Sequence, residues 1–237
     1  MTSQPPIAHP ANCAGDFYVE QDCCITCGVP LVKAPGIFAW AELAGYRSCV
    51  VARQPHTPME IHQTLSAMHS AEVDCIRYRG TDHELSRRIA EMGYAASCDL
   101  APPADARPLF RSHASFRPTG SAVVEPASQW AAAFRRYFLQ CDSSHQDVGA
   151  KAIAWDRTEA TAQISWRGGV YHAVEFKRLA DGGGVLKTMP GPDGVENGIG
   201  LSIFVEEWLL QDGRFQDIRW FSAGQWQAGG PHSPTAI

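Results

Sequence analysis

The N-terminal half of the chain alternates between short apolar runs and longer segments in which apolar residues recur at helical spacing. The apolar runs are bounded by polar residues and predict strands at residues 16–20, 48–53 and 74–78. The longer segments lie between and after these strands. The pattern therefore predicts a domain in which strands and helices alternate.

Two helices in this half carry explicit start signals. Thr57 can cap a helix, Pro58 suits its first turn, and Glu60 completes a capping box. Thr81 and Glu84 have the same three-residue spacing and predict a second helix start. We therefore expect helices to follow the second and third strands.

The C-terminal half begins with a helical pattern and continues as strands. Aromatic residues recur on one face of a helix expected over residues 127–139, and a second helix is expected around residues 201–209, after a loop over 190–200. Strands are expected at 150–156, 161–166, 170–177, 185–189 and 218–221, with a hairpin turn at 167–169. This order favours an antiparallel sheet with helices on one face.

A proline-rich segment over residues 101–108 separates the two halves and is the expected linker. The predicted domains are residues 13–100 and 109–226, each of the α+β class. The first 12 residues are rich in proline, and we expect them, like those after 229, to be tails.

Charge and composition exclude some functions. Residues 1–105 carry 7 Lys and Arg against 12 Asp and Glu, so the negative net charge of −5 belongs to the N-terminal half. An acidic surface argues against a nucleic-acid partner, which requires a basic face. We find no apolar run long enough to span a membrane and no secretory signal, and we expect a cytoplasmic protein.

Cysteines are concentrated in the acidic half. Because cytoplasmic thiols stay reduced, we first interpret them as ligands, thiols or core residues. The eight positions are Cys13, Cys23, Cys24, Cys27, Cys49, Cys75, Cys98 and Cys141.

One segment carries a recognisable motif. Residues 22–30 read Asp-Cys-Cys-Ile-Thr-Cys-Gly-Val-Pro, and Ala-Pro-Gly-Ile-Phe follows at 34–38. This pattern resembles that of single-cluster ferredoxins, which carry Asp, then C-I-x-C-G-x-C, then A-P-x-x-F. The resemblance implies that Cys24 and Cys27 are cluster ligands and that residues 34–38 open a helix over the cluster. It continues to about residue 80.

Two ligand positions of the ferredoxin pattern are lost. The third is occupied by Pro30, and the fourth, aligned through Ile76, is Ala71. Since a [4Fe–4S] cluster normally takes four thiolates, a cluster here needs two replacement ligands, for which Cys75 and Cys23 are the candidates. Cys49 falls on a predicted strand, and the sequence does not assign the direction of its side chain. The alternative is a ferredoxin-like fold retained without its cluster. Consecutive side chains on an extended loop point apart, which counts against Cys23 joining Cys24.

Three other kinds of site have less support in the sequence than the ferredoxin-like interpretation. A zinc site at Cys24 and Cys27 lacks a second ligand pair, and Cys141 with His145 lacks an orienting group for a nucleophile and base. A catalytic site in the C-terminal half would have to use side chains at positions typical of solvated faces, namely His172, Glu175, Lys177, Glu206 and Glu207.

The sequence thus leaves two main hypotheses. The first is a non-catalytic ferredoxin-like protein with electron-transfer ancestry and a degenerate iron–sulfur site at Cys24, Cys27, Cys75 and Cys23. The second is a protein-binding scaffold, an accessory or immunity-type module such as bacteria use, without a cofactor. Both expect a protein partner of unidentified class and no membrane or nucleic-acid partner.

Overall fold

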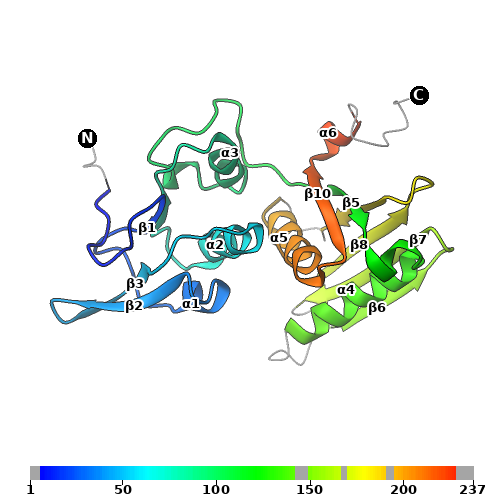
Figure 1. Cartoon of the computed structure of the whole chain (residues 1–237), viewed down its shortest axis with the longest axis horizontal. Helices are drawn as coiled ribbons and strands as arrows, with labels where there is room; N and C mark the ends of the chain where they lie inside the picture. Colours follow the sequence, from blue (N-terminus) through cyan, green and yellow to red (C-terminus); the bar gives the residue numbers. More distant parts are fainter. Residues whose placement is uncertain (1–5, 142–148, 167–169, 191–194, 228–237) are drawn as a thin grey trace. The chain divides into compact units, whose positions relative to one another are not determined.

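The computed structural model describes residues 6–141, 149–166, 170–190 and 195–227. The chain separates into two compact units, Met1–Leu109 and Phe110–Ile237, and each is described by itself. The elements combine helices with antiparallel sheets, so the predicted α+β class is confirmed (Figure 1). No helix within the described ranges is both long enough and apolar enough to cross a bilayer.

Unit 1 is built from two small antiparallel sheets and three helices. β1 pairs with β4, with Val19 opposite Ile76, and β2 pairs with β3 as a hairpin. The elements are β1 (Phe17–Val19), α1 (Val29–Lys33), β2 (Phe38–Leu43), β3 (Tyr46–Val51), α2 (Pro58–Ser70), β4 (Ile76–Tyr78), α3 (His83–Glu91) and the 3₁₀ turn η1 (Ala95–Ser97). The predicted alternation of strands and helices is present, with one additional strand, β2.

The start of α2 follows its sequence signal. The Thr57 hydroxyl accepts the Glu60 N–H at 3.2 Å, and the Glu60 carboxylate accepts the Thr57 N–H at 3.1 Å, which completes the capping box. The start of α3 differs from the prediction by one residue. Asp82, not Thr81, is the N-cap, and its carboxylate accepts the N–H groups of residues 84 and 85.

The expected helix opening at residues 34–38 is wrong. The short helix α1 lies before this segment, and Ala34 is its C-cap. The chain then enters β2 at Phe38, and the hairpin turns at Ala44 and Gly45, which both have positive φ. Two consecutive residues in the left-handed region match the twist of a tight hairpin turn. The segment therefore continues as a sheet.

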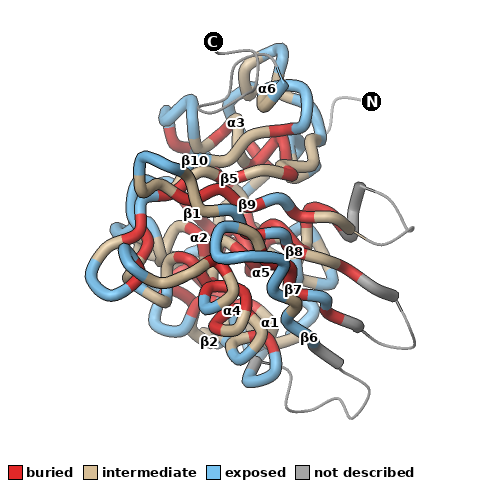
Figure 2. The backbone as a smooth tube through the Cα atoms, turned by 90° about the vertical axis from the view of Figure 1, so that its right-hand side faces the viewer, coloured by how far each residue is buried: buried red, intermediate tan, exposed pale blue. Residues whose placement is uncertain are grey.

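The core of unit 1 lies between α2, α3 and the two small sheets. Its buried side chains are Phe17, Val19, Ala34, Ile37, Phe38, Cys49, Val51, Leu65, Ala67, Met68, Cys75, Ile76, Tyr78, Ile89 and Cys98. Most of these residues lie on α2 and on the strands, whereas the connecting loops are largely exposed or half-buried. Figure 2 colours the backbone by burial. Burial of these apolar groups is the main stabilising contribution to the unit.

Unit 2 contains a six-stranded antiparallel sheet, with the strands in the order β10-β5-β9-β8-β7-β6, together with helices. The additional strand β5 was not expected from the sequence. The elements are β5 (His113–Pro118), η2 (Gly120–Val123), α4 (Ala127–Cys141), β6 (Gly149–Ala154), β7 (Glu159–Trp166), β8 (Val170–Arg178), β9 (Gly184–Met189), α5 (Val195–Asp212), β10 (Phe215–Phe221) and α6 (Ala223–Gln227).

Helices α4 and α5 cover the same face of this sheet, as predicted (Figure 1). Trp130 and Phe134 of α4, Trp208 of α5 and Phe176 of β8 are fully or almost fully buried together. The ring centroids of Phe134 and Trp208 lie 5.3 Å apart in an edge-on arrangement. The opposite face of the sheet carries alternate, mostly polar residues, as expected for a two-layer unit.

Two further expectations concern the segment before α5 and the connection between β7 and β8. The loop expected over 190–200 is partly helical, because α5 begins at Val195 and its apolar face is continued by the buried Ile199. The predicted hairpin is present as the antiparallel β7–β8 pair, but its turn at 167–169 lies outside the described residues. His145 lies outside them as well.

Candidate functional site

The candidate site is the cysteine-bearing loop between β1 and α1. Asp22, Thr26 and Gly28 all have positive φ, between 58° and 78°, so the loop coils tightly. Only glycine adopts this region without steric cost. A Cβ added at Gly28 would meet only the Trp40 ring, at 3.8 Å. The conformation of the loop therefore depends on backbone geometry at three positions.

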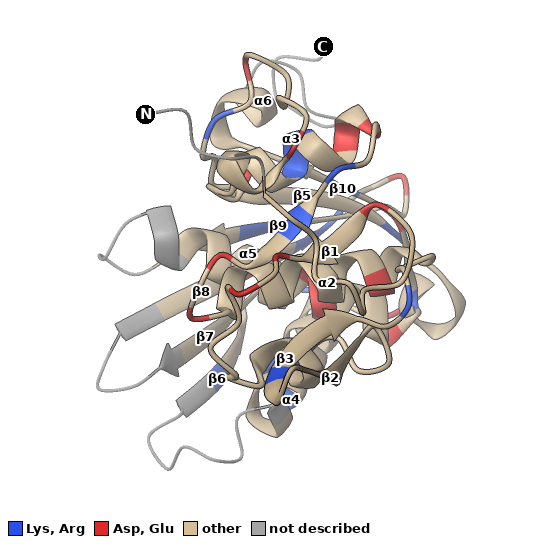
Figure 3. Cartoon of the chain, turned by 90° about the vertical axis from the view of Figure 1, so that its left-hand side faces the viewer, with Lys and Arg blue, Asp and Glu red and all other residues tan. Residues whose placement is uncertain are grey.

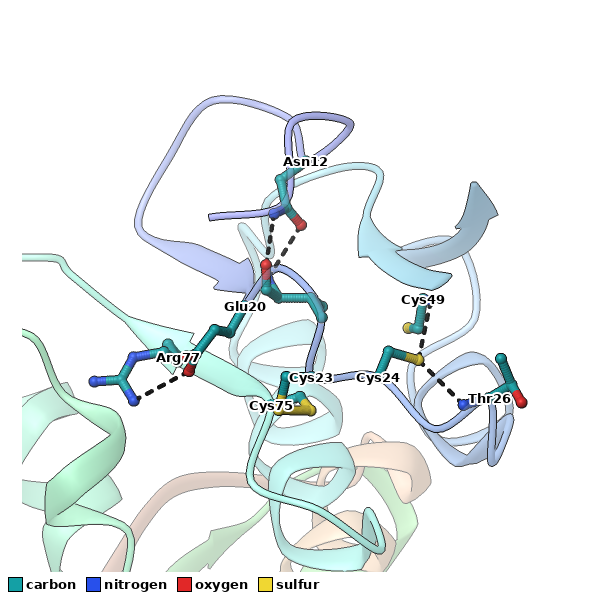
Figure 4. The surroundings of a disulfide bond; sticks show 9 residues. Asn12, Glu20, Cys23, Cys24, Thr26, Cys49, Cys75 and Arg77 are labelled. Atoms are coloured by element: carbon teal, nitrogen blue, oxygen red, sulfur yellow. Dashed lines mark hydrogen bonds and ion pairs between the residues drawn. A yellow bond between two sulfur atoms is a disulfide. The ribbon is translucent and has the colours of Figure 1, made fainter. Parts of the chain in front are cut away.

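Asn12 fixes β1, which leads into the loop, against β3. Its side-chain oxygen accepts the N–H groups of Val19 and Val51 at 3.1 and 2.9 Å, and its amide donates to the Val19 carbonyl at 2.8 Å (Figure 4). At the beginning of the loop, the Glu20 N–H donates to the Cys75 carbonyl at 2.9 Å. The loop thus starts beside the residue that precedes β4.

This placement joins Cys23 and Cys75, which are 52 positions apart in sequence, in a disulfide with Cα atoms 5.6 Å apart. Cys75 is buried and Cys23 is half-buried. The pairing follows from the β1–β4 register, because Cys23 lies shortly after β1 and Cys75 directly before β4. The structure therefore brings two of the four predicted ligands together as partners of each other.

Cys24 points away from this disulfide. Its sulfur accepts the N–H groups of Thr26 and Cys49, both at 3.3 Å (Figure 4). The side chains of the adjacent residues Cys23 and Cys24 thus point in different directions, as expected from the sequence. Cys27 is also a free, half-buried thiol. The four predicted ligands are divided between a disulfide and a pair of free thiols.

Cys49 is a further cysteine near this pair, one that the sequence left without an assigned direction. Burial raises the pKa of its thiol to about 12, and negative charge at Cys24 and Cys27 acts in the same direction. Its thiol is therefore protonated at neutral pH. Cys98 behaves similarly, since burial raises its pKa to about 11.

The two lost ligand positions have structural roles. Pro30 is buried in the first turn of α1, where a missing N–H costs no hydrogen bond. Ala71 is the C-cap of α2 and donates its N–H to the Ala67 carbonyl. Within the described ranges, no group of three or more His, Cys, Asp or Glu side chains is arranged to hold a metal ion. In this arrangement the residues do not fit a four-thiolate cluster site.

A surface hollow of about 480 Å³ lies beside the loop. Its lining includes Cys24, Ile25, Tyr46 and Arg47, which come from the loop and from the hairpin β2–β3. Ile25 and Tyr46 are exposed to 50% and 78%. The Arg47 guanidinium lies 4.4 Å above the Trp40 ring, which holds it on the hairpin.

His172 and Glu175, the candidate pair of unit 2, do not converge on a catalytic site. His172 is buried and lies on the helix-covered face of β8, opposite Ile164, whereas Glu175 lies on the uncovered face. The pair that a catalytic site in unit 2 would need is therefore on opposite sides of one strand. Comparison of the chain with protein-family models, with curated proteins and with solved structures finds no match.

Proposed function

We propose that this chain is a non-catalytic, ferredoxin-like protein whose first unit holds a disulfide in place of its cluster and serves as a protein-binding module. The observation that carries the proposal is the Cys23–Cys75 disulfide. It removes two thiols from the predicted ligand set, and a disulfide sulfur is not the thiolate that iron requires.

The packing of unit 1 supports a cofactor-free fold. An iron–sulfur cluster crosslinks several segments of chain through its thiolates, so a fold that loses it needs another source of stability. Here a disulfide joins the loop to β4, Pro30 is buried at one former ligand position, and the apolar core is continuous around Cys49 and Cys75. Each of these features stabilises the unit without a metal.

The surface beside the loop supports a protein partner. Ile25 and Tyr46 expose apolar side chains at the hollow, Leu43 exposes one beside Tyr46 on the hairpin, and Arg47 adds a charged group held on Trp40. We call these four residues the hairpin surface. Leu43 and Tyr46 are register partners in the β2–β3 hairpin. Aromatic residues and arginine are enriched in protein interfaces, where they contribute most of the binding energy.

The cofactor part of the proposal is tested by anaerobic purification followed by iron, sulfide and visible-absorption measurements, with and without prior reduction. We expect no iron and no colour in either state. About four irons per chain, lost in a Cys24→Ser variant, would identify a thiolate cluster and overturn the proposal in favour of electron transfer. Cys98→Ser is the matched control, because Cys98 lies outside the loop.

The partner part is tested by affinity capture from source cells with matched surface variants. Tyr46→Asp places a charge on the hairpin surface, and Val124→Asp places the same charge at an exposed position of unit 2. We expect a protein retained by the wild type and by Val124→Asp to be lost with Tyr46→Asp. Equal capture by all three proteins would contradict a role for this surface.

If the protein is cytoplasmic, as the sequence predicts, the proposal requires the disulfide to persist in a reducing compartment. Disulfides are rare in a reducing cytoplasm, so Cys23 and Cys75 would have to stay bonded because Cys75 is buried. Trapping of thiols by rapid alkylation in intact cells measures this directly. Alkylation of both residues in cells would show that the disulfide is absent there.

A further inference from the structure

The uncovered face of the sheet in unit 2 carries two adjoining hollows, of about 340 and 260 Å³. Both are lined by Glu175 and Lys177 of β8, so the two hollows lie on either side of the same pair of side chains, and we call them together the trough. Trp155 lines the first hollow and Trp226 lines the second. The trough therefore has an indole ring at each end and charged groups in the middle.

The strand register explains why these side chains share one face. His113 lies opposite Lys187, Lys187 opposite Glu175, and Glu175 opposite Thr161, across β5, β9, β8 and β7. Directly opposed residues in antiparallel strands point to the same side. Three steps between strands of about 4.8 Å each give this row a length of about 14 Å. The trough thus runs across the strands.

Both indole rings are held in place. The Trp155 Nε1–H donates to the Thr161 hydroxyl at 2.9 Å, although 67% of the residue is exposed. Trp226 stacks on the His113 ring, with centroids 5.1 Å apart and planes at 12°, and contacts Phe221 edge-on. Rings that are fixed before a ligand arrives lose little conformational entropy on binding.

The charges lining the trough balance. Lys177 forms an ion pair with Glu159 at 2.5 Å, and Lys187 is the register partner of Glu175. Burial, and then the charge of Lys187, lowers the pKa of His113, so its ring is uncharged at neutral pH. Two cations and two carboxylates leave no net charge to attract a strongly charged ligand.

We propose that the trough binds a neutral oligosaccharide. Sugar rings present flat C–H faces that can stack on Trp155 and Trp226, and hydroxyl edges that can bond to Glu175 and Lys177. A lipid chain is disfavoured because four charged side chains, Glu159, Glu175, Lys177 and Lys187, line the hollows, and an acidic or basic polymer is disfavoured by their balanced charge. This inference concerns unit 2 and is independent of the function proposed for unit 1.

The test is calorimetric titration of the full chain with maltohexaose, cellohexaose, xylohexaose and N-acetylchitohexaose. We expect at least one of these to bind, and Trp155→Ala and Trp226→Ala each to weaken it roughly tenfold. Glu175→Gln should weaken binding as well. Gln163→Ala is the matched control, because Gln163 is exposed on the same face of β7 but lines neither hollow.

Two measurements keep the result interpretable. Circular dichroism and the thermal midpoint show whether each variant is folded, and Trp155→Phe retains an aromatic ring if the alanine variant unfolds; it should keep most of the affinity. The proposal is overturned if none of the neutral oligosaccharides binds at millimolar concentration. It is equally overturned if binding survives both tryptophan substitutions. Binding of a heparin-derived hexasaccharide or of a peptide, in place of the neutral oligosaccharides, would overturn it as well.

Discussion

Removal of the disulfide in unit 1 should cost a large part of the stability of that unit. The perturbation is the double variant Cys23→Ser/Cys75→Ser, since a single substitution leaves a thiol that can pair with Cys24 instead. The bond joins residues separated by 52 positions, and closure of a loop of this length lowers the entropy of the unfolded chain by an amount worth about 4 kcal/mol at 25 °C. For a unit of this size that corresponds to a fall in melting temperature of roughly 15–30 °C.

The assay is guanidinium unfolding of the full chain, monitored in unit 1 by hydrogen exchange at the amides of α2 and β4. We expect their protection to fall by the predicted free energy while the amides of unit 2 keep theirs. Cys24→Ser is the control, because it leaves the disulfide intact. A double variant within about 1 kcal/mol of the wild type would refute the loop-closure reasoning.

Three further predictions follow from local contacts. Hydrogen bonds from the Arg53 side chain and from backbone N–H groups lower the pKa of Glu60 from 4.5 to about 2. The ionised Glu60 carboxylate therefore stabilises the fold fully above pH 4.5, and this stabilisation is lost as the pH falls towards 2. Glu60→Gln should thus lower stability at pH 7 and have little effect at pH 2. Phe134→Ala should destabilise unit 2 by about 3–5 kcal/mol in urea unfolding, since the ring is fully buried. Native alkylation at pH 8, followed by mass spectrometry, should modify Cys24 and spare Cys49, whose pKa is about 12.

For each of these three predictions, one outcome would contradict the reasoning. An equal loss of stability at pH 2 and pH 7 would show that Glu60 acts through packing. A loss below about 1 kcal/mol for Phe134→Ala would mean that the core refills the cavity. Rapid alkylation of Cys49 would show that the β3 side of the loop opens readily in the native state.

The elements that were predicted correctly are mainly those specified by residues close together in sequence. The capping box at Thr57 and Glu60 and the aromatic face around Phe134 depend on residues close in sequence, and both elements form where the sequence predicts them. The strand β2 was missed because the family resemblance assigned residues 34–38 to a helix. Its hairpin turn at Ala44 lacks the Asn-Gly or Asp-Gly pair that most strongly indicates a tight turn.

The pairing of Cys23 with Cys75 could not be predicted from the sequence. Cys23 and Cys75 were both singled out from the sequence, as replacement ligands for a cluster. Their bond to each other depends on the β1–β4 register, which is a contact between distant segments that local patterns do not encode. The expected cytoplasmic location also favoured thiols over disulfides.

The order of strands in unit 2 has a consequence for how the unit can be moved between proteins. β5 is its first strand and β10 its last, and the two are neighbours, with His113 opposite Phe221 (Figure 1). The chain therefore enters and leaves the sheet at the same corner. Units whose ends adjoin tolerate circular permutation and insertion into loops of other domains.

Charge does not oppose such transfer, because acidic and basic residues are spread along the sequence of unit 2 and do not gather in one segment. Figure 3 marks the acidic and basic residues on the ribbon. Residues 106–237 carry as many Lys and Arg as Asp and Glu, 13 of each. Without Arg107, which belongs to unit 1, unit 2 carries 12 Lys and Arg against 13 Asp and Glu. A unit with adjoining ends and a net charge this close to zero can be fused to a new neighbour without a long linker or strong electrostatic repulsion. Unit 2 is thus suited to recombination as a self-contained module.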